Sequence, residues 1–223
     1  MQSKNGGYAA YDSDNTYYYL NQIPFADHGA LLDPPTSDVS DRCAALLAQL
    51  GYRGRELTEC LNFLYQEQEE DGSWFGRWGT NYIYGTWSVL TALERAGHRP
   101  DQPHIRRAVG WLKGVQRTDG GWGEDCDTYS EKEKAGKGYA STSFQTAWAM
   151  LGLMAAGEVD SAAVRRGAEY LIRTQKADGL WNDEWFTAPG FPRVFYLKYH
   201  GYGKYFPLWA LARYRNLRSN KLA

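Results

Sequence analysis

The sequence lacks the features that mark several common classes of protein. Its 223 residues carry a formal net charge of −1 and no basic patch, so electrostatics gives no reason to expect nucleic acid or an anionic surface as a partner. No apolar run approaches the roughly 18 to 20 residues that cross a bilayer, and no charged-then-apolar leader follows Met1, so neither a transmembrane helix nor a signal peptide is predicted. The three cysteines lie far apart without a C-x-x-C spacing, at Cys43, Cys60 and Cys126. This usage argues against a disulfide framework and a zinc knuckle and favours a reducing compartment.

Aromatic residues, by contrast, are abundant. They make up 15% of the chain, with nine Trp and seventeen Tyr, which is more than core packing alone usually requires. The hydrophobic content of 43% is enough for a sizeable core in one large domain or two small ones. The composition therefore indicates a folded domain with a further use for aromatic rings.

A seven-residue unit occurs four times, with a glutamine at its first position, a glycine at its fifth and an aromatic ring at its seventh. The glycine can supply the positive φ of a turn, and the glutamine amide can bond backbone groups left open at a helix end. The ring can stack on that amide or on a neighbouring unit. We therefore predict a helix, a turn and a ring as one structural unit, repeated at a loose period. The units are Gln2–Tyr8, Gln68–Trp74, Gln116–Trp122 and Gln175–Trp181.

Hydrophobic periodicity predicts two kinds of helix that alternate along the chain. Residues 81–93 and 144–156 are apolar on all sides, as expected of helices surrounded by protein. Residues 103–115 and 161–174 are amphipathic, with an apolar stripe and a charged face. Alternating inner and outer helices is the pattern of an α/α toroid. No strand-period stretch is long enough to oppose this all-α fold.

Residues 37–223 are expected to form the helical repeats, and the polar, aromatic residues 1–36 an extended segment that packs on them. Ser37 is expected to cap a first helix that stops at Gly51, residues 124–138 to form a loop, and a last helix to begin near Pro207. The first helix has an apolar stripe that we expect to be buried, formed by Val39, Cys43, Leu46, Leu47 and Leu50.

The repeats resemble the QW motifs, Q-x-x-D-G-x-W, of triterpene cyclases, and other stretches resemble bacterial squalene-hopene cyclases in particular. The resemblance runs nearly end to end but covers only the C-terminal part of such an enzyme. Residues 1–223 are thus expected to form a partial cyclase domain, a toroid incomplete at its N-terminus. The further matching stretches are residues 14–16, 23–27, 32–39, 74–82, 120–126 and 190–192.

The resemblance implies cyclisation of squalene, or a similar polyprene, to hopene or hopanol by protonation of an alkene and a cation cascade, without a cofactor or metal. The family's acid lies in a D-x-D-D motif, which Asp12–Asn15 and Asp125–Thr128 only approach. The chain alone is therefore expected to be inactive and to need a missing N-terminal half. The resemblance also implies a peripheral position on the cytoplasmic side of a membrane, and it is compatible with a homodimer.

Two charged residues are candidates for catalysis. Asp38 and Arg42 stand at i and i+4, on one face of a predicted helix. The resemblance places Asp38 among the polar groups that support the catalytic aspartate. Arg42 stands where some relatives have His, so a proton-relay role does not carry over, although a fixed cation could hold the partner of an acid. From the spacing alone, an exposed pair on a helix surface is the alternative.

A C-terminal group of rings is the main candidate for substrate binding. Phe191, Phe195, Tyr199 and Tyr202 are spaced 4, 4 and 3 apart, which predicts one side of a helix with Pro192 near its start. The spacing alone favours a core stripe, whereas the match to the F-P-x-x-F-Y-x-x-Y segment of the family implies a cavity wall. Aromatic faces stabilise cations by roughly 0.5 to 2 kcal/mol each without acting as nucleophiles.

The same resemblance adds further cavity residues and assigns the rings of the repeats to structure. His28 stands where some relatives have an aromatic ring. The added cavity residues are Tyr11, Phe25, Trp78 and Tyr84, and the structural rings are Trp74, Trp122 and Trp181.

Two alternatives remain open at this point. A protein prenyltransferase β subunit is also an α/α toroid but needs a zinc site, for which the set would be Glu124, Asp125, Cys126 and His200. The ligand spacing is unsuitable, because the aspartate adjoins the cysteine. A non-catalytic helical-repeat scaffold would have no enclosed aromatic cavity and no affinity for polyprenoids.

Overall fold

The computed structural model describes residues 1–14, 17–25 and 31–219. His28 and the pair Asn15–Thr16, which contributed to the sequence interpretation, lie outside these residues. The described part is mainly helical, with seven α-helices, three short 3₁₀ helices and one two-stranded hairpin. Within it, no helix is both long and apolar enough to cross a bilayer.

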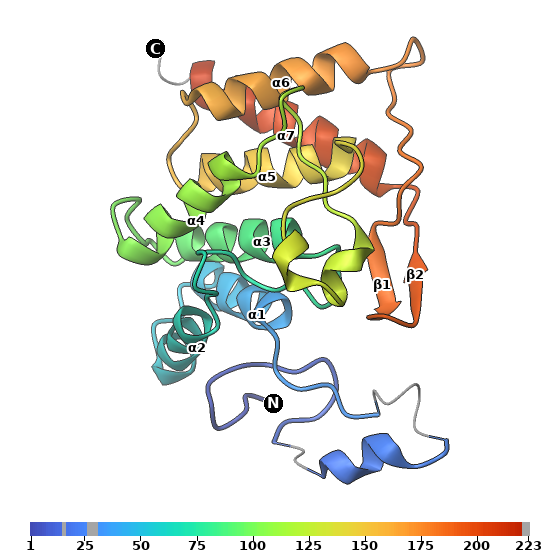
Figure 1. Cartoon of the computed structure of the whole chain (residues 1–223). Helices are drawn as coiled ribbons and strands as arrows, with labels where there is room; N and C mark the ends of the chain where they lie inside the picture. Colours follow the sequence, from blue (N-terminus) through green and yellow to red (C-terminus); the bar gives the residue numbers. More distant parts are fainter. Residues whose placement is uncertain (15–16, 26–30, 220–223) are drawn as a thin grey trace.

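The α-helices form two rows, as Figure 1 shows. The inner row packs in chain order, with α1 against α3, α3 against α5 and α5 against α7. The outer helices cover it, α2 on α1, α4 on α3 and α5, and α6 on α5 and α7. The inner helices are α1 (Ser37–Gln49), α3 (Tyr82–Arg95), α5 (Ser143–Ala155) and α7 (Tyr202–Ser219). The outer helices are α2 (Arg55–Gln66), α4 (Pro103–Gly114) and α6 (Ala162–Thr174).

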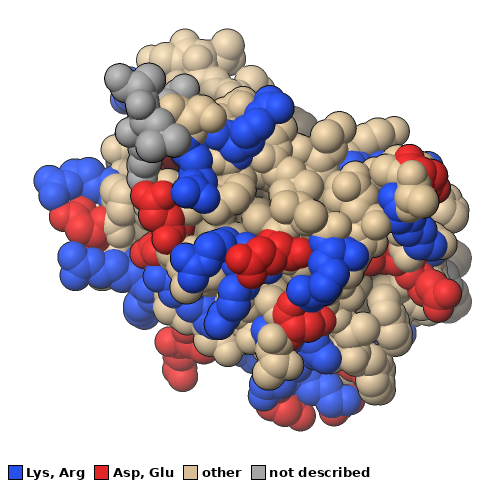
Figure 2. Space-filling model, turned by 90° about the horizontal axis from the view of Figure 1, so that it is seen from above, with Lys and Arg blue, Asp and Glu red and all other residues tan. Residues whose placement is uncertain are grey.

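Burial follows the two predicted kinds of helix. Every residue of α5 is buried, as is α3 from Tyr82 to Leu93. Helix α6 buries Val164, Ala168 and Leu171 and leaves its charged face in solvent. Seen from above, the molecule shows Lys and Arg interspersed with Asp and Glu (Figure 2), in keeping with a net charge near zero. For the four helices on which the prediction rested, buried α3 and α5 do alternate with amphipathic α4 and α6.

Helix α1 departs from the prediction in its cap and its buried face. The N-cap residue is Thr36 rather than Ser37, and its side chain makes no capping hydrogen bond. The predicted apolar stripe is wrong, because Leu46 and Leu50 are 56% and 74% exposed. Helix α1 instead approaches its neighbours through small and polar residues that find hydrogen-bond partners there. The buried set is Ser37, Asp38, Ser40, Asp41, Ala44, Ala45 and Ala48.

The C-terminal region also differs from the prediction. The helix predicted through the four rings is a β-hairpin, in which β1 (Ala188–Phe191) pairs antiparallel with β2 (Phe195–Leu197). Pro192 lies in the turn, where a missing N–H costs nothing, and Arg193 there has a φ of 68°. Helix α7 begins at Tyr202 rather than near Pro207, which lies inside the helix. The fold is therefore mainly helical rather than strictly all-α.

Among the described residues of the segment 1–36, the one regular element is η1 (Tyr18–Gln22). The first residues of this segment contact the helices: Gln2 bonds the Glu56 carbonyl at 2.8 Å, and the Tyr8 N–H donates to Ser40 Oγ at 2.8 Å. Farther along the segment, Tyr17 to Tyr19 are 57% to 65% exposed. Residues 126–134, within the predicted 124–138 loop, form η3 (Cys126–Tyr129) and η4 (Lys132–Lys134).

The four repeat units share one geometry. The glutamine Nε2 donates to the carbonyl of the glycine four residues on, at 2.7 to 2.9 Å, and that glycine has a φ between 80° and 99°. In the first three units Nε2 also reaches a carbonyl in the first turn of the next outer helix, at 2.8 to 2.9 Å. The indole N–H of each tryptophan donates to the leucine carbonyl ten residues earlier, on the preceding outer helix. The units at Gln68 and Gln116 thus link neighbouring outer helices, α2 to α4 and α4 to α6. In all four units the amide N–H groups bond backbone carbonyls rather than the aromatic ring.

Candidate active site

A polar cluster lies where the N-terminal ends of α1 and α3 meet the loop 75–81. Asp38 is buried in the first turn of α1 and accepts hydrogen bonds from the Thr36 hydroxyl and the Trp78 backbone N–H, both at 2.7 Å. Four residues on, Arg42 donates to the Tyr84 hydroxyl at 3.2 Å. Asp38 is therefore no part of an exposed surface pair, and the structure places Asp38, Arg42, Trp78 and Tyr84 together.

Burial shifts the acidity of this cluster. It raises the pKa of Asp38, while the bonds from Thr36 and Trp78 oppose that rise. Burial also raises the pKa of the Tyr84 hydroxyl, against the opposing charge of Arg42. The tyrosine is thus held as a neutral hydroxyl that accepts from the guanidinium.

The Tyr84 ring packs on bare backbone. A Cβ on Gly79 would lie 2.5 Å from this ring, and one on Gly76 would lie 2.8 Å from it, so the loop can approach only because both residues are glycine. The other face of the ring meets Trp148 of α5, with centroids 5.0 Å apart, and Trp87 of α3, at 5.6 Å. Tyr84 therefore has little freedom to move.

Arg42 also lies over aromatic faces. Its guanidinium carbon is 5.4 Å from the Trp87 ring centroid and 5.9 Å from that of Tyr84. The Trp87 ring stacks on Trp148 at 5.7 Å, with an interplanar angle of 5°. The guanidinium cation of Arg42 thus lies against two aromatic faces, the arrangement by which such rings stabilise positive charge.

Arg77 joins this cluster to the hairpin. It is 5% exposed, forms an ion pair of 3.4 Å with Asp33 and donates to the Gly190 carbonyl at 3.3 Å. Its guanidinium carbon lies 4.2 Å from the Trp78 centroid and 5.9 Å from that of Phe191. Three separate segments thus meet at one buried cation.

The hairpin and the start of α7 carry the C-terminal rings. Phe191 and Phe195 meet edge to face with centroids 5.4 Å apart, and Phe195 is 41% exposed. Tyr199 and Tyr202 lie 5.1 Å apart, and Tyr202 contacts Trp148 at 5.8 Å. The rings therefore form two pairs, one near Arg77 and one near Trp148, rather than one helical stripe.

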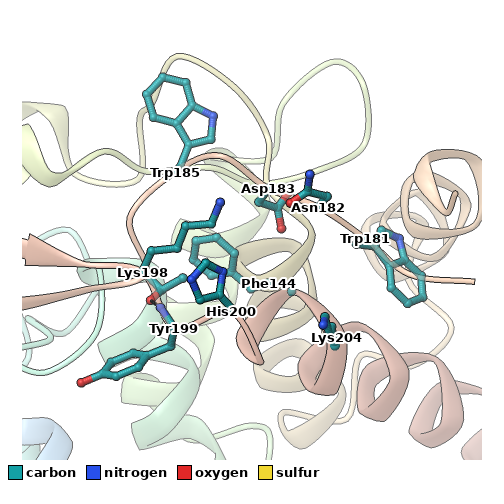
Figure 3. A pocket seen from close by; sticks show the side chains of 11 residues that line it. Phe144, Trp181, Asn182, Asp183, Trp185, Lys198, Tyr199, His200 and Lys204 are labelled. Atoms are coloured by element: carbon teal, nitrogen blue, oxygen red, sulfur yellow. Dashed lines mark hydrogen bonds between the residues drawn. The ribbon is translucent and has the colours of Figure 1, made fainter. Parts of the chain in front are cut away.

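A small cavity of about 130 Å³ lies beside this region, between the loop 181–187 and the start of α7. Figure 3 shows the imidazole of His200 between the side chains of Lys198 and Lys204, with the ring of Tyr199 turned away from Trp181. Asp183 faces the same cavity and bonds the first residue of α5, Ser143.

Two predicted cavity residues stand apart from the others. Tyr11 is 51% exposed and Phe25 is 84% exposed, on the irregular segment that Figure 1 shows beside the helices. The structure does not bring them to the cluster around Asp38. His28, the third candidate from that segment, lies outside the described residues.

The zinc set considered above does not converge. Within the described residues, no group of three His, Cys, Asp or Glu side chains is placed to hold a metal. Glu124 is buried against the start of α3, whereas His200 lines the cavity of Figure 3.

Sequence reasoning did not assign Asp33, Asp41 or Arg77 to the site and considered Glu124 only as a zinc ligand, whereas all four are buried near it. Asp41 is 1% exposed and accepts a hydrogen bond from Ser88 at 2.8 Å, and burial raises its pKa well above the ordinary value. Charged residues are ordinarily assigned to the surface, so nothing in their own periodicity indicates burial. For Arg77, the flanking glycine and tryptophan residues were the available signal.

Known proteins resemble this chain over nearly its whole length. The family model of the squalene-hopene cyclase C-terminal domain matches residues 1–216. The chain is 60% identical to the squalene–hopene cyclase of Bradyrhizobium diazoefficiens, over 98% of this chain and 34% of that protein. It is 47% identical to that of Alicyclobacillus acidocaldarius, over 96% and 34%. It is also 41% identical to dammaradiene synthase of Dryopteris crassirhizoma, over 100% and 36%. The chain thus spans about a third of the length of these curated relatives.

Solved structures show a similar fold. A type II terpene cyclase from Scytonema superimposes with a TM-score of 0.59 and 20% sequence identity, over 86% of this chain and 51% of that one. At this identity the likeness concerns the fold alone. Together with the family model, it leads to one conclusion: the chain belongs to the squalene-hopene cyclase C-terminal domain family.

Proposed function

We propose that this chain forms one wall of the catalytic cavity of a squalene-hopene cyclase, which cyclises squalene or a similar polyprene through carbocations. The observation that carries the proposal is the cluster in which buried Asp38 holds the Trp78 loop while Arg42 holds Tyr84. Rings of the hairpin adjoin it through Arg77. Such a wall offers aromatic faces to a cation.

The division of labour follows from the residues present. The 223 residues contain no D-x-D-D motif, so the proton that starts the cascade would come from an acid elsewhere in the enzyme. Asp38 would support that acid, and Arg42 would fix Tyr84 rather than relay protons. The rings of Trp78, Tyr84, Phe191, Phe195, Tyr199 and Tyr202 would stabilise the later cations.

The proposal includes a closed α/α toroid in the complete enzyme. Helices α1 and α7 end the inner row, and each leaves apolar side chains exposed. Further helices packed there would cover these apolar side chains. Peripheral attachment to the cytoplasmic side of a membrane and a homodimer belong to the same proposal and rest on the family alone. The exposed side chains are Leu46, Leu50, Tyr205, Leu208 and Trp209.

A hybrid enzyme tests the proposal. This chain would replace the matching third of the Bradyrhizobium diazoefficiens squalene–hopene cyclase, and the product would be incubated with squalene. We expect pentacyclic triterpenes, because the exchanged parts are 60% identical. A hybrid that folds, with a cooperative melting transition, but leaves squalene unchanged would contradict the proposal.

Phe195→Ala in the hybrid should change the product pattern. Removing the ring takes away a cation–π contact of roughly 1 to 2 kcal/mol, enough to slow the step that it serves by about five- to thirtyfold. Deprotonation or water capture of the preceding cation would then compete, so products with fewer rings should increase while squalene is still consumed. Gas chromatography of the products gives the ratio.

Phe195→Tyr is the matched control and should stay near the parent, because it keeps the aromatic face. A purely structural role for Phe195 predicts the opposite combination, a lower melting temperature of the Ala variant with an unaltered product ratio. That combination would remove Phe195 from the cavity.

We also propose that the repeat units are structural, and two glutamines offer a comparison within one chain. Gln116 donates to both Gly120 and Ala163 at 2.9 Å and also accepts an exposed bond from Arg166, which is expected to add little, whereas Gln175 donates to Gly179 alone among the described residues. At about 1 kcal/mol for each hydrogen bond, Gln116→Ala should cost about 2 kcal/mol and Gln175→Ala about 1 kcal/mol. Melting temperatures should fall by about 4 to 8 °C and about 2 to 4 °C. Equal losses would show that the link between outer helices adds nothing.

A further inference from the structure

Two repeat units are followed, two residues after the tryptophan, by a carboxylate that bonds the start of an inner helix. Glu124 follows Trp122 and contacts α3, and Asp183 follows Trp181 and contacts α5. In both cases the helix contacted is the inner helix that precedes the carboxylate in the chain. The second residue after the tryptophan therefore has a function of its own in these two repeats, although it lies outside the seven residues that define the unit.

Glu124 is 3% exposed and lies against the N-terminal end of α3. Its Oε2 accepts the backbone N–H of Ile83 at 2.9 Å and that of Asn81 at 3.4 Å. These N–H groups belong to the first turn, which has no partner within its own helix, and a carboxylate is favoured at this positive end of the helix dipole. Asn81, the N-cap residue, makes no side-chain capping bond of its own, so Glu124 supplies the cap from 43 residues away in the chain.

Asp183 repeats the arrangement at α5. Its Oδ1 accepts the Ser143 N–H at 2.9 Å, and its Oδ2 accepts the Ser143 hydroxyl. Ser143 is the first residue of α5. The two carboxylates thus occupy equivalent places in successive repeats.

The equivalent position for α1 is Gly76, two residues after Trp74. A glycine leaves the start of α1 without a remote carboxylate, and the Trp78 N–H reaches Asp38 there instead. The loop 75–81 can enter this space because nothing larger stands at position 76, where a Cβ would lie 2.4 Å from the Asn81 carbonyl oxygen. Among α1, α3 and α5, only the start of α1 lacks the remote carboxylate, and the Trp78 loop of the candidate site lies in that place.

Glu124 also belongs to a buried network that holds the Trp78 loop. The backbone of Glu124 exchanges two hydrogen bonds with the Gln145 side chain, at 2.8 and 2.9 Å, and Gln145 donates in turn to the Thr80 carbonyl. Five residues on, the Tyr129 hydroxyl lies within hydrogen-bond distance of the Gly76 and Gly79 carbonyls, at 2.8 and 2.7 Å. The segment 124–129 therefore fixes both the start of α3 and the loop before it.

The Oε1 atom of Glu124 is buried and accepts no hydrogen bond among the described residues. Leaving such an oxygen unpaired costs stability, because the atom loses its hydrogen bonds to water and gains none in the protein. An apolar residue at this place would avoid that cost but would leave the first turn of α3 uncapped. Glu124 therefore holds the start of α3 in place at some cost to the stability of the fold.

We propose that Glu124 is a positioning residue of the active site, holding the first turn of α3 so that Tyr84 and Trp78 face the substrate. Asp183 is its structural counterpart at α5, whose first turn carries none of the candidate cavity residues. The inference rests on the proposed function for the nature of the site, but the placement of α3 is a property of this chain alone. Tyr84 is one residue beyond Ile83, so a shift of the first turn moves its ring and its contact with Arg42 directly.

Hydrogen exchange of the 223-residue chain tests the placement. Glu124→Ala should speed exchange of the amides at Asn81 to Tyr84 by about tenfold or more, the equivalent of one lost hydrogen bond, and leave α6 unchanged. Asp183→Ala should speed exchange of the Ser143 amide and leave exchange at residues 81–84 unchanged. Exchange that rises equally in all helices in both variants, or that stays unchanged at residues 81–84 in Glu124→Ala, would overturn the inference.

The hybrid cyclase tests the consequence for the reaction. Glu124→Ala should misplace the rings and so lower the turnover of squalene by the hybrid about tenfold or more. Glu124→Gln should keep most of the turnover, because the amide carbonyl oxygen can still accept the Ile83 N–H. Faster exchange at residues 81–84 with unchanged turnover would overturn the positioning role. An inactive parent hybrid would contradict the proposed function, while the exchange experiment would still decide whether Glu124 places α3.

Discussion

Asp38→Asn in the hybrid cyclase is expected to lower turnover of squalene by about 100-fold or more, the loss typical when proton transfer in a transition state is disrupted. The carboxylate accepts from both the Thr36 hydroxyl and the Trp78 N–H. The asparagine amide offers one acceptor in place of two and sets a donor against one of these donors. It also removes the negative charge that would support the acid. The measurement is squalene consumption per enzyme, with the melting temperature of the same preparation.

Asp41→Asn is the control for neutralising a buried carboxylate on the same helix. Asp41 lies between α1 and α3, where it bonds Ser88 rather than the Trp78 loop. We expect its replacement to affect stability more than turnover. If Asp38→Asn kept turnover within about threefold of the parent at an unchanged melting temperature, Asp38 would have no part in supporting the acid.

Glu124→Gln should remove a large part of the pH dependence of stability in this chain. Burial raises the pKa of Glu124 from 4.5 to about 7, against the opposing bonds from backbone N–H groups. The folded state then holds a proton that the unfolded state has released, so this group's contribution is fully present below pH 4.5 and is lost as pH rises through 7. A shift of this size corresponds to about 3 kcal/mol between pH 4.5 and pH 8.

Urea unfolding at several pH values measures this difference. Other buried carboxylates also titrate, so the informative quantity is the difference between the parent and Glu124→Gln at each pH. That difference should change by about 3 kcal/mol between pH 4.5 and pH 8, in favour of the glutamine variant at the higher pH. Parallel curves for the two proteins would show that Glu124 has an ordinary pKa and that the hydrogen bonds from the Ile83 and Asn81 N–H groups offset its burial.

The repeats and the alternation of helices could be predicted because both depend on local pattern. In the unit Gln116–Trp122, the glycine supplies the turn and the indole reaches back ten residues, within a single helix–turn unit. Helix α5 could be predicted as an inner helix, because a helix without a polar face is expected to be surrounded by protein. These features require no knowledge of distant partners.

The buried face of α1 and the hairpin, in contrast, depend on partners that are distant in the chain. Ser40 and Asp41 are buried because Tyr8 and Ser88 bond them, while Leu46 is left exposed at the end of the inner row. The spacing of Phe191 and Phe195 imitates a helix, but Pro192 and the close contact between Gly190 and the Phe195 ring form a turn instead. A proline one residue after the first ring was the warning that the helical period was coincidental.

The candidate site could be predicted in part. Asp38, Arg42, Trp78 and Tyr84 do come together, although their distances apart in the chain gave no reason by themselves to expect it; the family resemblance supplied that reason. Arg77 and Glu124 were not foreseen as parts of the site, because a charged residue is buried only where tertiary partners satisfy it. Tyr11 and Phe25 remain exposed in the described structure, so their part in the cavity is still a prediction.

The most direct measurement incubates the 223-residue chain alone and the hybrid cyclase with squalene under the same conditions and compares the products. The account predicts hopene or related pentacyclic products from the hybrid and unchanged squalene from the chain alone, since no residue in it matches the D-x-D-D acid. Cyclised product from the chain alone would contradict the assignment of the acid to another part of the enzyme. A folded hybrid without cyclised product would contradict the claim that these residues form the wall of the cavity.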